Sequence, residues 1–155
     1  MMEIAFLCRE MRPEDVPVCA AIEATVADGW SSAALAEELA QPTARLFVAE
    51  TPHNSPPPQI AALAVFQLVC EEASLYTIST APALRRQGAA RALLQYAFAQ
   101  LAAQGAQTVF LEVRAQNKAA RALYTALGFE ETGTRRGFYT KPNDDAVLMR
   151  FAVIP

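Results

Sequence analysis

Hydrophobic and polar positions along the chain follow two periods, and each change of period marks a predicted element. Apolar residues at helical spacing predict helices over residues 13–27, 31–40, 85–104 and 117–127. Apolar runs rich in branched and aromatic residues predict strands over 4–9, 45–50, 59–70, 73–80, 108–113 and 144–153, with another from Phe129 onward. Four prolines between Thr51 and Pro58 predict an exposed loop, because proline cannot donate to a helix or a strand ladder.

The predicted order is β-α-α-β-β-β-α-β-α-β-β, which combines hairpins with one β-α-β crossover from Ala73 to Val113. Hairpins join antiparallel strands, whereas a crossover of this kind joins parallel ones. The sequence therefore predicts one α/β domain over residues 1–155. Its mixed sheet should carry helices on both faces.

Composition and charge narrow the class of protein. A chain of 155 residues with 53% hydrophobic residues can bury the core of one globular domain. A net charge of -3 disfavours a nucleic-acid binder. The longest apolar run, residues 60–66, is too short to span a bilayer, and the N-terminus lacks a secretory signal pattern. We expect a cytoplasmic protein that binds neither nucleic acid nor membrane.

Cysteine and histidine are too few and too scattered for a metal site. Cys8, Cys19 and Cys70 include no CxxC pair, a pattern typical of reduced, buried thiols. The only histidine, His53, lies in the proline-rich segment. We therefore expect no bound metal.

The first candidate binding segment lies between the predicted strand at 73–80 and the helix that follows it. This segment is Arg85-Arg86-Gln87-Gly88-Ala89-Ala90-Arg91. Free N–H groups at a helix N-terminus bind phosphate oxygens, and a glycine there allows a close approach. The segment lacks the glycines of a dinucleotide fold and the lysine of a P-loop. A phosphate cradle and an ordinary solvated, basic helix start explain it about equally well.

A second candidate group begins at Glu112, the one charged residue in the apolar strand 108–113. A carboxylate there is costly to bury unless it is paired or takes up a proton, and proton uptake suits a general base. A structural ion pair, with Arg114 or with a residue of a neighbouring strand, is the alternative. Asn117 is a good helix N-cap, and Tyr124 lies beside the apolar face of the next helix, where aromatics mostly fill cores.

Together these segments resemble the GNAT acetyltransferase superfamily and, within it, the ribosomal-protein-alanine N-acetyltransferase (RimI-type) group. Residues 85–90 match the pyrophosphate-loop pattern Q/R-x-x-G-x-G/A. The similar segments are 111–117 to LEVRxxN, 122–129 to ALYxxLGF, 135–139 to RRxYY, and 29–31 to PWS. Gly29 replaces the usual proline of the last segment. The resemblance covers the chain from about Trp30 to its end.

The resemblance implies a GNAT-type, mostly antiparallel sheet in which a bulge splays two parallel strands and opens a slot for acetyl-coenzyme A. Asn117 would bond the pantetheine arm, and the strand backbone of Ile78, Ser79 and Thr80 would pair with it like an added strand. The residues implied to hold the pyrophosphate are Arg85, Arg86, Gln87, Gly88, Ala89, Ala90 and Arg91.

The resemblance also assigns Glu112 as the general base and Tyr124 as the general acid. Glu112 would take a proton from the acceptor ammonium, and Tyr124 would protonate the leaving thiolate. A backbone N–H of residues 78–80 would stabilise the oxyanion. No cysteine occupies a matching nucleophile position, which disfavours an acyl-enzyme route.

The acceptor that the resemblance implies is a protein N-terminus, an alanine of a small-subunit ribosomal protein. The acidic Glu37, Glu38, Glu71 and Glu72 are candidates for attracting a basic peptide, although a solvated surface explains at least half of them.

Lysine side chains, polyamines and small amines remain open as acceptors. A coenzyme-A-binding sensor without turnover is the alternative from a different class.

Overall fold

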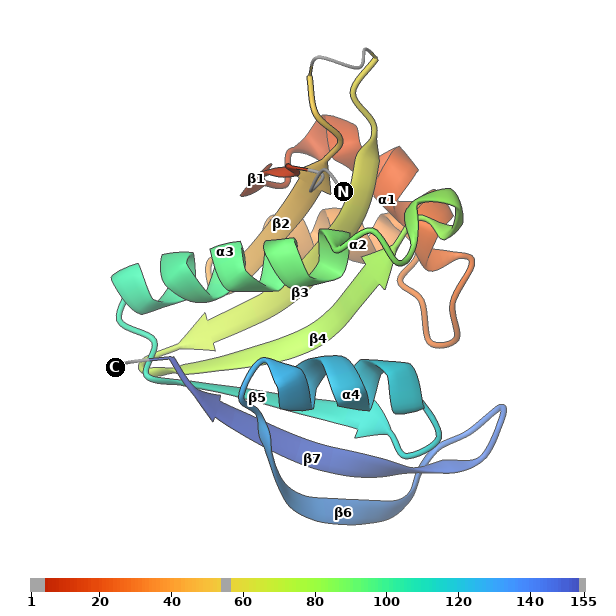
Figure 1. Ribbon diagram of the computed structural model, residues 1–155, viewed down its shortest axis with the longest axis vertical. Helices are drawn as coiled ribbons and strands as arrows, with labels where there is room; N and C mark the ends of the chain where they lie inside the picture. The colour runs from red at the N-terminus through yellow and green to blue at the C-terminus, as the bar shows by residue number, and fades with distance from the viewer. Residues whose placement is uncertain (1–4, 54–56, 154–155) are drawn as a thin grey trace.

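Strands and helices follow one another in the predicted order (Figure 1). The structure is a computed structural model that describes residues 5–53 and 57–153. In these ranges the strands are β1 (Leu7–Glu10), β2 (Ala44–Glu50), β3 (Ile60–Val69), β4 (Glu72–Thr80), β5 (Thr108–Arg114), β6 (Glu130–Tyr139) and β7 (Asp144–Ala152). The α-helices are α1 (Val16–Glu23), α2 (Ser32–Leu39), α3 (Ala89–Ala103) and α4 (Lys118–Ala126). Ile4 of the first predicted strand and residues 54–56 of the predicted loop lie outside the described residues.

The strands join one sheet in the spatial order β1-β2-β3-β4-β5-β7-β6. β4 and β5 run parallel, and all other neighbours are antiparallel. β6 forms one edge, and its register with β7 shifts between Glu131 and Gly133 and again between Arg135 and Tyr139. The predicted mixed, mostly antiparallel α/β fold is confirmed.

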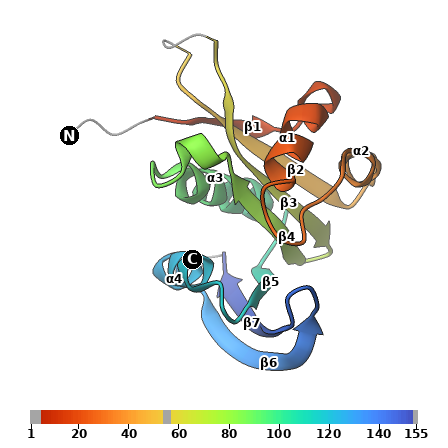
Figure 2. The same ribbon diagram turned by 90° about the vertical axis from the view of Figure 1, so that its right-hand side faces the viewer.

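Alternation along β2 and β3 divides the core between the two faces of the sheet. Phe47 and Phe66 face the cluster that includes α3 and α4, whereas Val48 and Val65 face α1 and α2. Figure 2 shows the two pairs of helices on opposite sides of the sheet, as the sequence predicts. Because successive strand residues point to opposite faces, one apolar run fills both cores.

Helix α3 gains most of its stability from one buried face, made of Leu93, Leu94, Ala97, Phe98 and Leu101. Each fully buried leucine contributes roughly 1.5–3 kcal/mol relative to an exposed one. No helix in the described part of the chain is both long and apolar enough to cross a membrane.

Two of the predicted helices have wrong boundaries. The helix expected from Arg85 begins at Ala89, because Arg86 (φ 64°) and Gly88 (φ 87°) adopt left-handed conformations that interrupt a right-handed helix. The helix expected over 13–27 spans only Val16–Glu23, after a 3₁₀ turn at residues 13–15. After Glu23 the chain enters the loop that connects α1 with α2.

The expectation of buried thiols holds for Cys19 but not for Cys70. Cys19 is fully buried, and burial raises the pKa of its thiol to about 12. Cys70 is exposed with φ 55° just beyond the end of β3, where the chain turns into β4. Cys8 is half-buried, and all three thiols are free.

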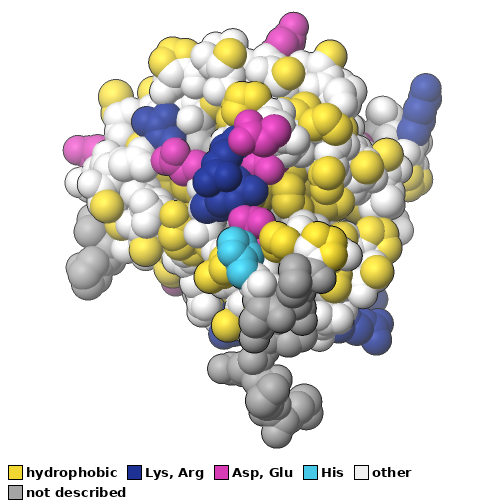
Figure 3. All heavy atoms as spheres, turned by 90° about the horizontal axis from the view of Figure 1, so that it is seen from above, with side chains coloured by type: hydrophobic (Ala, Val, Ile, Leu, Met, Phe, Trp, Pro, Cys, Tyr) yellow, Lys and Arg dark blue, Asp and Glu magenta, His cyan; other side chains and the backbone are white. Residues whose placement is uncertain are grey.

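Ion pairs of Arg9 connect β1 to β2 and to the 3₁₀ turn at residues 13–15. Arg9 donates to Glu50 of β2 at 2.6 Å and to Asp15 at 2.7 and 3.0 Å. Figure 3 shows basic and acidic side chains packed together beside the histidine on this face. The Arg9 hydrogen bonds lower the pKa of the Asp15 carboxyl, so the pair is ionised at neutral pH.

Candidate active site

The parallel strands β4 and β5 are paired at one end and separate at the other. Their ladder runs from Glu72 opposite Thr108 to Leu75 opposite Leu111, and then stops. On its other side β4 stays paired with β3 as far as Thr80, with a bulge at Tyr76. Among the described residues, the β5-facing backbone of residues 76–80 therefore has no strand partner. The bulge and the splayed pair that the resemblance implies are both present.

The turn from β4 into α3 has an unusual backbone and leaves open space at Gly88. Arg86 and Gly88 are both left-handed, and a Cβ placed on Gly88 would meet nothing within 4 Å. The first turn of α3 carries N–H groups that lack partners within the helix and a partial positive charge. A pyrophosphate site at residues 85–91 stays a prediction.

The predicted cofactor residues gather at this end of β4. Arg85 lies next to Thr80, with its Nε 3.4 Å from the Thr80 carbonyl oxygen. Ser79 is buried, whereas Arg86 and Arg91 are exposed. The other predicted cofactor residues in this region are Ile78, Gln87, Gly88, Ala89 and Ala90.

Asn117 performs the capping role that its sequence position suggests. Its Oδ1 accepts a hydrogen bond from the N–H of Ala120 at 3.1 Å, at the start of α4. Its side chain is exposed. A contact with a pantetheine arm stays a prediction.

Glu112 is more exposed than expected and lies on the open face of the sheet. Strand alternation buries Leu111 and Val113 against α3 and α4, and turns Glu112 to the opposite face. Helices α1 and α2 pack over β2, β3 and β4, so β5 stays uncovered there and the Glu112 side chain is 34% exposed. The cation beside Glu112 is Arg135 of β6, with Nη1 3.4 Å from Oε1, so the ion pair is made with another strand and not with Arg114.

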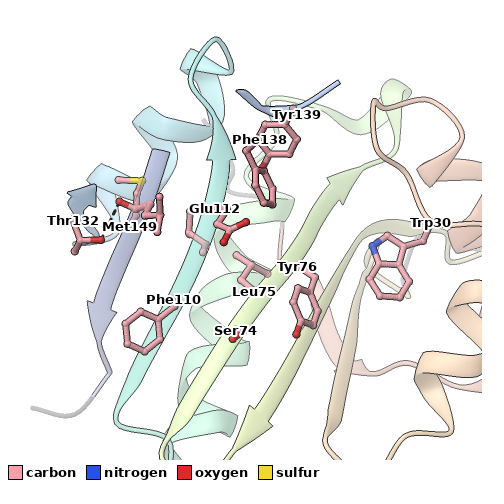
Figure 4. A pocket seen from close by; sticks show the side chains of 12 residues that line it. Trp30, Ser74, Leu75, Tyr76, Phe110, Glu112, Thr132, Phe138, Tyr139 and Met149 are labelled. Carbon is pink, nitrogen blue, oxygen red and sulfur yellow. Dashed lines mark hydrogen bonds between the residues drawn. The ribbon is translucent and has the colours of Figure 1, made fainter. Parts of the chain in front are cut away.

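A cavity of about 440 Å³ lies over this face of β4, β5 and β7 (Figure 4). Glu112 is the one carboxylate among the described residues that line it. The aromatic lining residues are Trp30, Tyr76, Phe110, Phe138 and Tyr139. Because a lone carboxylate in an aromatic cavity attracts and orients an ammonium group, the cavity suits an amine.

Tyr124 lies on the opposite face of the sheet from this cavity. It is 6% exposed and packs against Phe129, with ring centroids 5.6 Å apart. The role of a core aromatic is therefore confirmed. Burial raises the pKa of the Tyr124 phenol, with a further rise from the charge of Tyr139, so Tyr124 stays protonated at neutral pH. Its role as a general acid stays a prediction.

Sequence patterns missed a buried carboxylate beneath the α1–α2 loop. Glu23 is fully buried, and its Oε2 accepts the N–H of Trp30 at 2.9 Å while Thr77 donates to its Oε1 at 3.4 Å. A Cβ on Gly29 would come within 1.9 Å of the Glu23 carbonyl oxygen. Only glycine fits this close approach, and that is the one sequence signal that could have pointed to the contact.

Of the four acidic residues suggested for attracting a basic peptide, Glu38 is the one that hydrogen bonds connect to a residue lining the cavity, Tyr76. Its Oε1 accepts from Gln67 Nε2 at 2.8 Å, and Gln67 Oε1 in turn accepts from the Tyr76 hydroxyl at 3.1 Å. Glu71 and Glu72 lie at the β3–β4 turn, the opposite end of β4 from Thr80. Within the described residues, no three His, Cys, Asp or Glu side chains are grouped as metal ligands.

Residues 9–129 match the acetyltransferase (GNAT) family. The chain therefore belongs to the GNAT acetyltransferase family, whose members are acyltransferase enzymes. The splayed parallel strands β4 and β5 agree with this assignment.

Within that family the resemblance to the RimI-type group is confirmed. The chain is 43% identical over 97 residues to the ribosomal protein bS18-alanine N-acetyltransferase of Escherichia coli (strain K12). That match covers 61% of this chain and 66% of the relative, slightly less than two thirds of its length.

Solved structures agree with this placement. The crystal structure of the ribosomal-protein-S18-alanine N-acetyltransferase from Escherichia coli superposes with a TM-score of 0.85 at 34% identity, covering 97% of this chain and 96% of that one. Ard1 from Thermoplasma volcanium gives a TM-score of 0.85 over 98% of this chain and 100% of that one. At 20% identity, this second likeness shows the fold alone.

Proposed function

We propose that this protein transfers the acetyl group of acetyl-coenzyme A to the α-amine of a protein N-terminus, with an alanine-bearing ribosomal protein as acceptor. The observation that carries the proposal is the carboxylate of Glu112 in an aromatic cavity beside the gap between β4 and β5. The Escherichia coli relatives, named for alanine acetylation of a ribosomal protein, support the choice of acceptor. We include in the proposal that residues 1–155 form one domain, since all described strands join one sheet.

The open edge of β4 and the cradle of residues 85–91 are the surfaces proposed to hold acetyl-coenzyme A. The unpartnered backbone of Ile78, Ser79 and Thr80 would pair with the amide groups of the pantetheine arm, as an added strand does. The N–H groups at the start of α3 would hold the pyrophosphate, and Asn117 would bond the arm. When bound, this cosubstrate supplies an acetyl group activated as a thioester.

Glu112 is proposed as the general base. An amine attacks only after its ammonium loses a proton, and the Glu112 carboxylate reaches into the cavity where that ammonium would sit. Its partial exposure permits transfer directly or through one water. Arg135 lies beside the carboxylate, with its Nη1 3.4 Å from Glu112 Oε1.

Tyr124 is proposed as the general acid on the other side of the gap. Glu112 and Tyr124 lie on opposite faces of the sheet, so one can take a proton from the entering amine while the other gives a proton to the leaving sulfur. Burial makes Tyr124 a weaker acid than an exposed phenol. The same low-dielectric surroundings raise the pKa of a leaving thiol, which keeps the transfer feasible.

The decisive experiment offers the protein acetyl-coenzyme A and a short peptide with an N-terminal alanine followed by basic residues. A copy with a blocked N-terminus and an internal lysine is the matched control. Thiol release and peptide mass are measured together. We expect acetylation of the free α-amine alone.

Other outcomes replace parts of the proposal. Acetylation of lysine in the blocked peptide would keep the enzyme class and discard the N-terminal acceptor. Turnover with polyamines or other small amines, and not with either peptide, would make a small molecule the acceptor. Tight binding of coenzyme A without turnover of any amine would favour a sensor.

A further inference from the structure

One wall of the amine cavity comes from a loop, and another comes from the end of β6, where the pairing with β7 is irregular. Trp30 lies in the loop between α1 and α2. Phe138 and Tyr139 lie at the end of β6, where the register with β7 shifts after Arg135. Figure 4 shows Phe138 and Tyr139 next to Glu112, and Trp30 farther away, beyond Tyr76. Strand pairing alone therefore does not set the distance between the walls.

Arg114 connects both walls. Its Nε and Nη2 donate to the two carboxylate oxygens of Asp28, at 2.8 and 3.0 Å, in the α1–α2 loop. Its Nη1 and Nη2 donate to the carbonyl oxygens of Pro142 and Thr140, at 2.7 and 3.2 Å, beyond the end of β6. The guanidinium carbon lies 4.4 Å from the ring centroid of Tyr139.

The arrangement needs arginine rather than any cation. Four N–H groups of one planar fork are used at once, with a bidentate carboxylate on one side and carbonyls on the other. A lysine ammonium reaches only part of this set. The Arg114 side chain is 13% exposed, so water replaces its partners poorly when they are lost.

The loop that Arg114 holds is also fixed from below. Asp28 is followed by Gly29, which packs on the Glu23 carbonyl, and by Trp30, whose N–H donates to the buried Glu23 carboxylate. Position 28 is therefore held by Arg114 and position 30 by Glu23. Because Arg114 is two residues from Glu112 on β5 and points to the same face, it links this loop to the strand that carries the proposed base.

We propose that Arg114 is a positioning residue that sets the spacing between Trp30 and Tyr139 and thereby the affinity for the acceptor amine. The predicted effect of Arg114 on kinetics rests on the proposed function. Its predicted effect on the α1–α2 loop does not. Arg114 acts through the two walls and touches neither the acceptor nor the thioester.

The test uses Arg114→Lys and Asp28→Asn, two variants that break the same contact from opposite ends. Trp30 is the only tryptophan, so intrinsic fluorescence and acrylamide quenching report directly on the loop. We expect a red-shifted emission and quenching increased about twofold or more in both variants. With the alanine peptide, acceptor KM should rise about tenfold, while acetyl-coenzyme A KM and kcat change little.

The matched control is Arg121→Lys. Arg121 also bridges a carbonyl and a carboxylate, with Nη1 2.8 Å from the Ala115 oxygen and Nη2 2.7 Å from Glu131, but it lies outside the cavity lining. It should change neither the quenching of Trp30 nor acceptor KM.

Unchanged Trp30 quenching in both Arg114→Lys and Asp28→Asn would overturn the inference. So would an equal rise of KM for acceptor and cosubstrate together with a loss of thermal stability, which indicates a general structural role. If the wild-type protein acetylates no peptide, the proposed function fails, and the quenching result still decides whether Arg114 holds the loop.

Discussion

The two halves of the candidate site are built in different ways. Apart from the Asn117 side chain, the proposed cosubstrate side consists of backbone, namely the open edge of β4 and the first turn of α3, and this backbone is continuous in sequence from 76 to 91. The amine cavity on the other side consists of side chains from the α1–α2 loop and from strands β4 to β7. A site made of backbone depends on local conformation, whereas a site made of side chains depends on how distant segments pack.

The difference predicts how each half responds to substitution. Most side chains on the cradle can change without moving the N–H groups, so its sensitive positions are those with unusual backbone angles, above all Gly88. In the cavity, individual side chains and the contacts that hold them matter instead.

The largest expected effect separates chemistry from binding. Glu112→Gln and Tyr124→Phe should each lower kcat by about 10²–10⁴-fold, the usual contribution of one general acid or base, with acetyl-coenzyme A affinity unchanged. Rapid mixing with the alanine peptide measures kcat, and calorimetric titration measures cosubstrate affinity. Near-native kcat in both variants would show that the assignment of acid and base is wrong.

A smaller effect tests the backbone half alone. Gly88→Ala should raise the KM for acetyl-coenzyme A about tenfold, because a methyl group then occupies the space in front of the cradle and the residue resists its left-handed angle. The KM for the peptide should stay constant.

Gly105→Ala is the matched control for this change. Gly105 is also left-handed, with φ 99° and open space around its Cβ, but it follows the far end of α3. Both variants should lose about 1 kcal/mol of stability from backbone strain. If Gly105→Ala weakens acetyl-coenzyme A binding as much as Gly88→Ala does, the effect is strain and not loss of the cradle.

The smallest effect concerns pH. Burial raises the pKa of Tyr124, and the acid function needs the protonated phenol, so it is fully present below that raised pKa and lost only above it. The kcat profile should therefore show no alkaline fall from Tyr124 below about pH 10, the ordinary tyrosine value. Tyr124→Phe should lower the profile between pH 7 and 10 without changing its shape. An alkaline fall near pH 8 that disappears in this variant would contradict the buried acid.

The sequence predicts the backbone half better than the side-chain half for the same physical reason. Gly88 indicates a turn whose conformation depends only on the residues next to it in sequence. The order of the strands likewise follows from local periodicity. The start of α3 was misplaced because the left-handed angle of Arg86 is imposed on a residue that ordinarily favours helices.

Side-chain partners depend on segments that are distant in sequence, so the predictions about them are less accurate than the predictions about the backbone. For Glu112 the sequence predicts either burial with uptake of a proton or an ion pair, with Arg114 or with a residue of a neighbouring strand. Its partner is Arg135, and Arg114 pairs with Asp28, 86 positions away in the chain. The buried Glu23 gave no periodic signal, because a single carboxylate on a short helix resembles an ordinary surface residue until the loop above it is placed.

The irregular strand β6 also bears on how copies of this protein behave toward one another. An edge strand offers a row of free N–H and C=O groups on which another chain can add a strand, the first step toward aggregation. In β6 two register shifts interrupt that row, and the exposed charges of Glu130, Glu131, Arg135 and Arg136 repel or misalign an incoming strand. The distortion that brings Phe138 and Tyr139 to the cavity thus also protects the edge of the sheet against unwanted self-association.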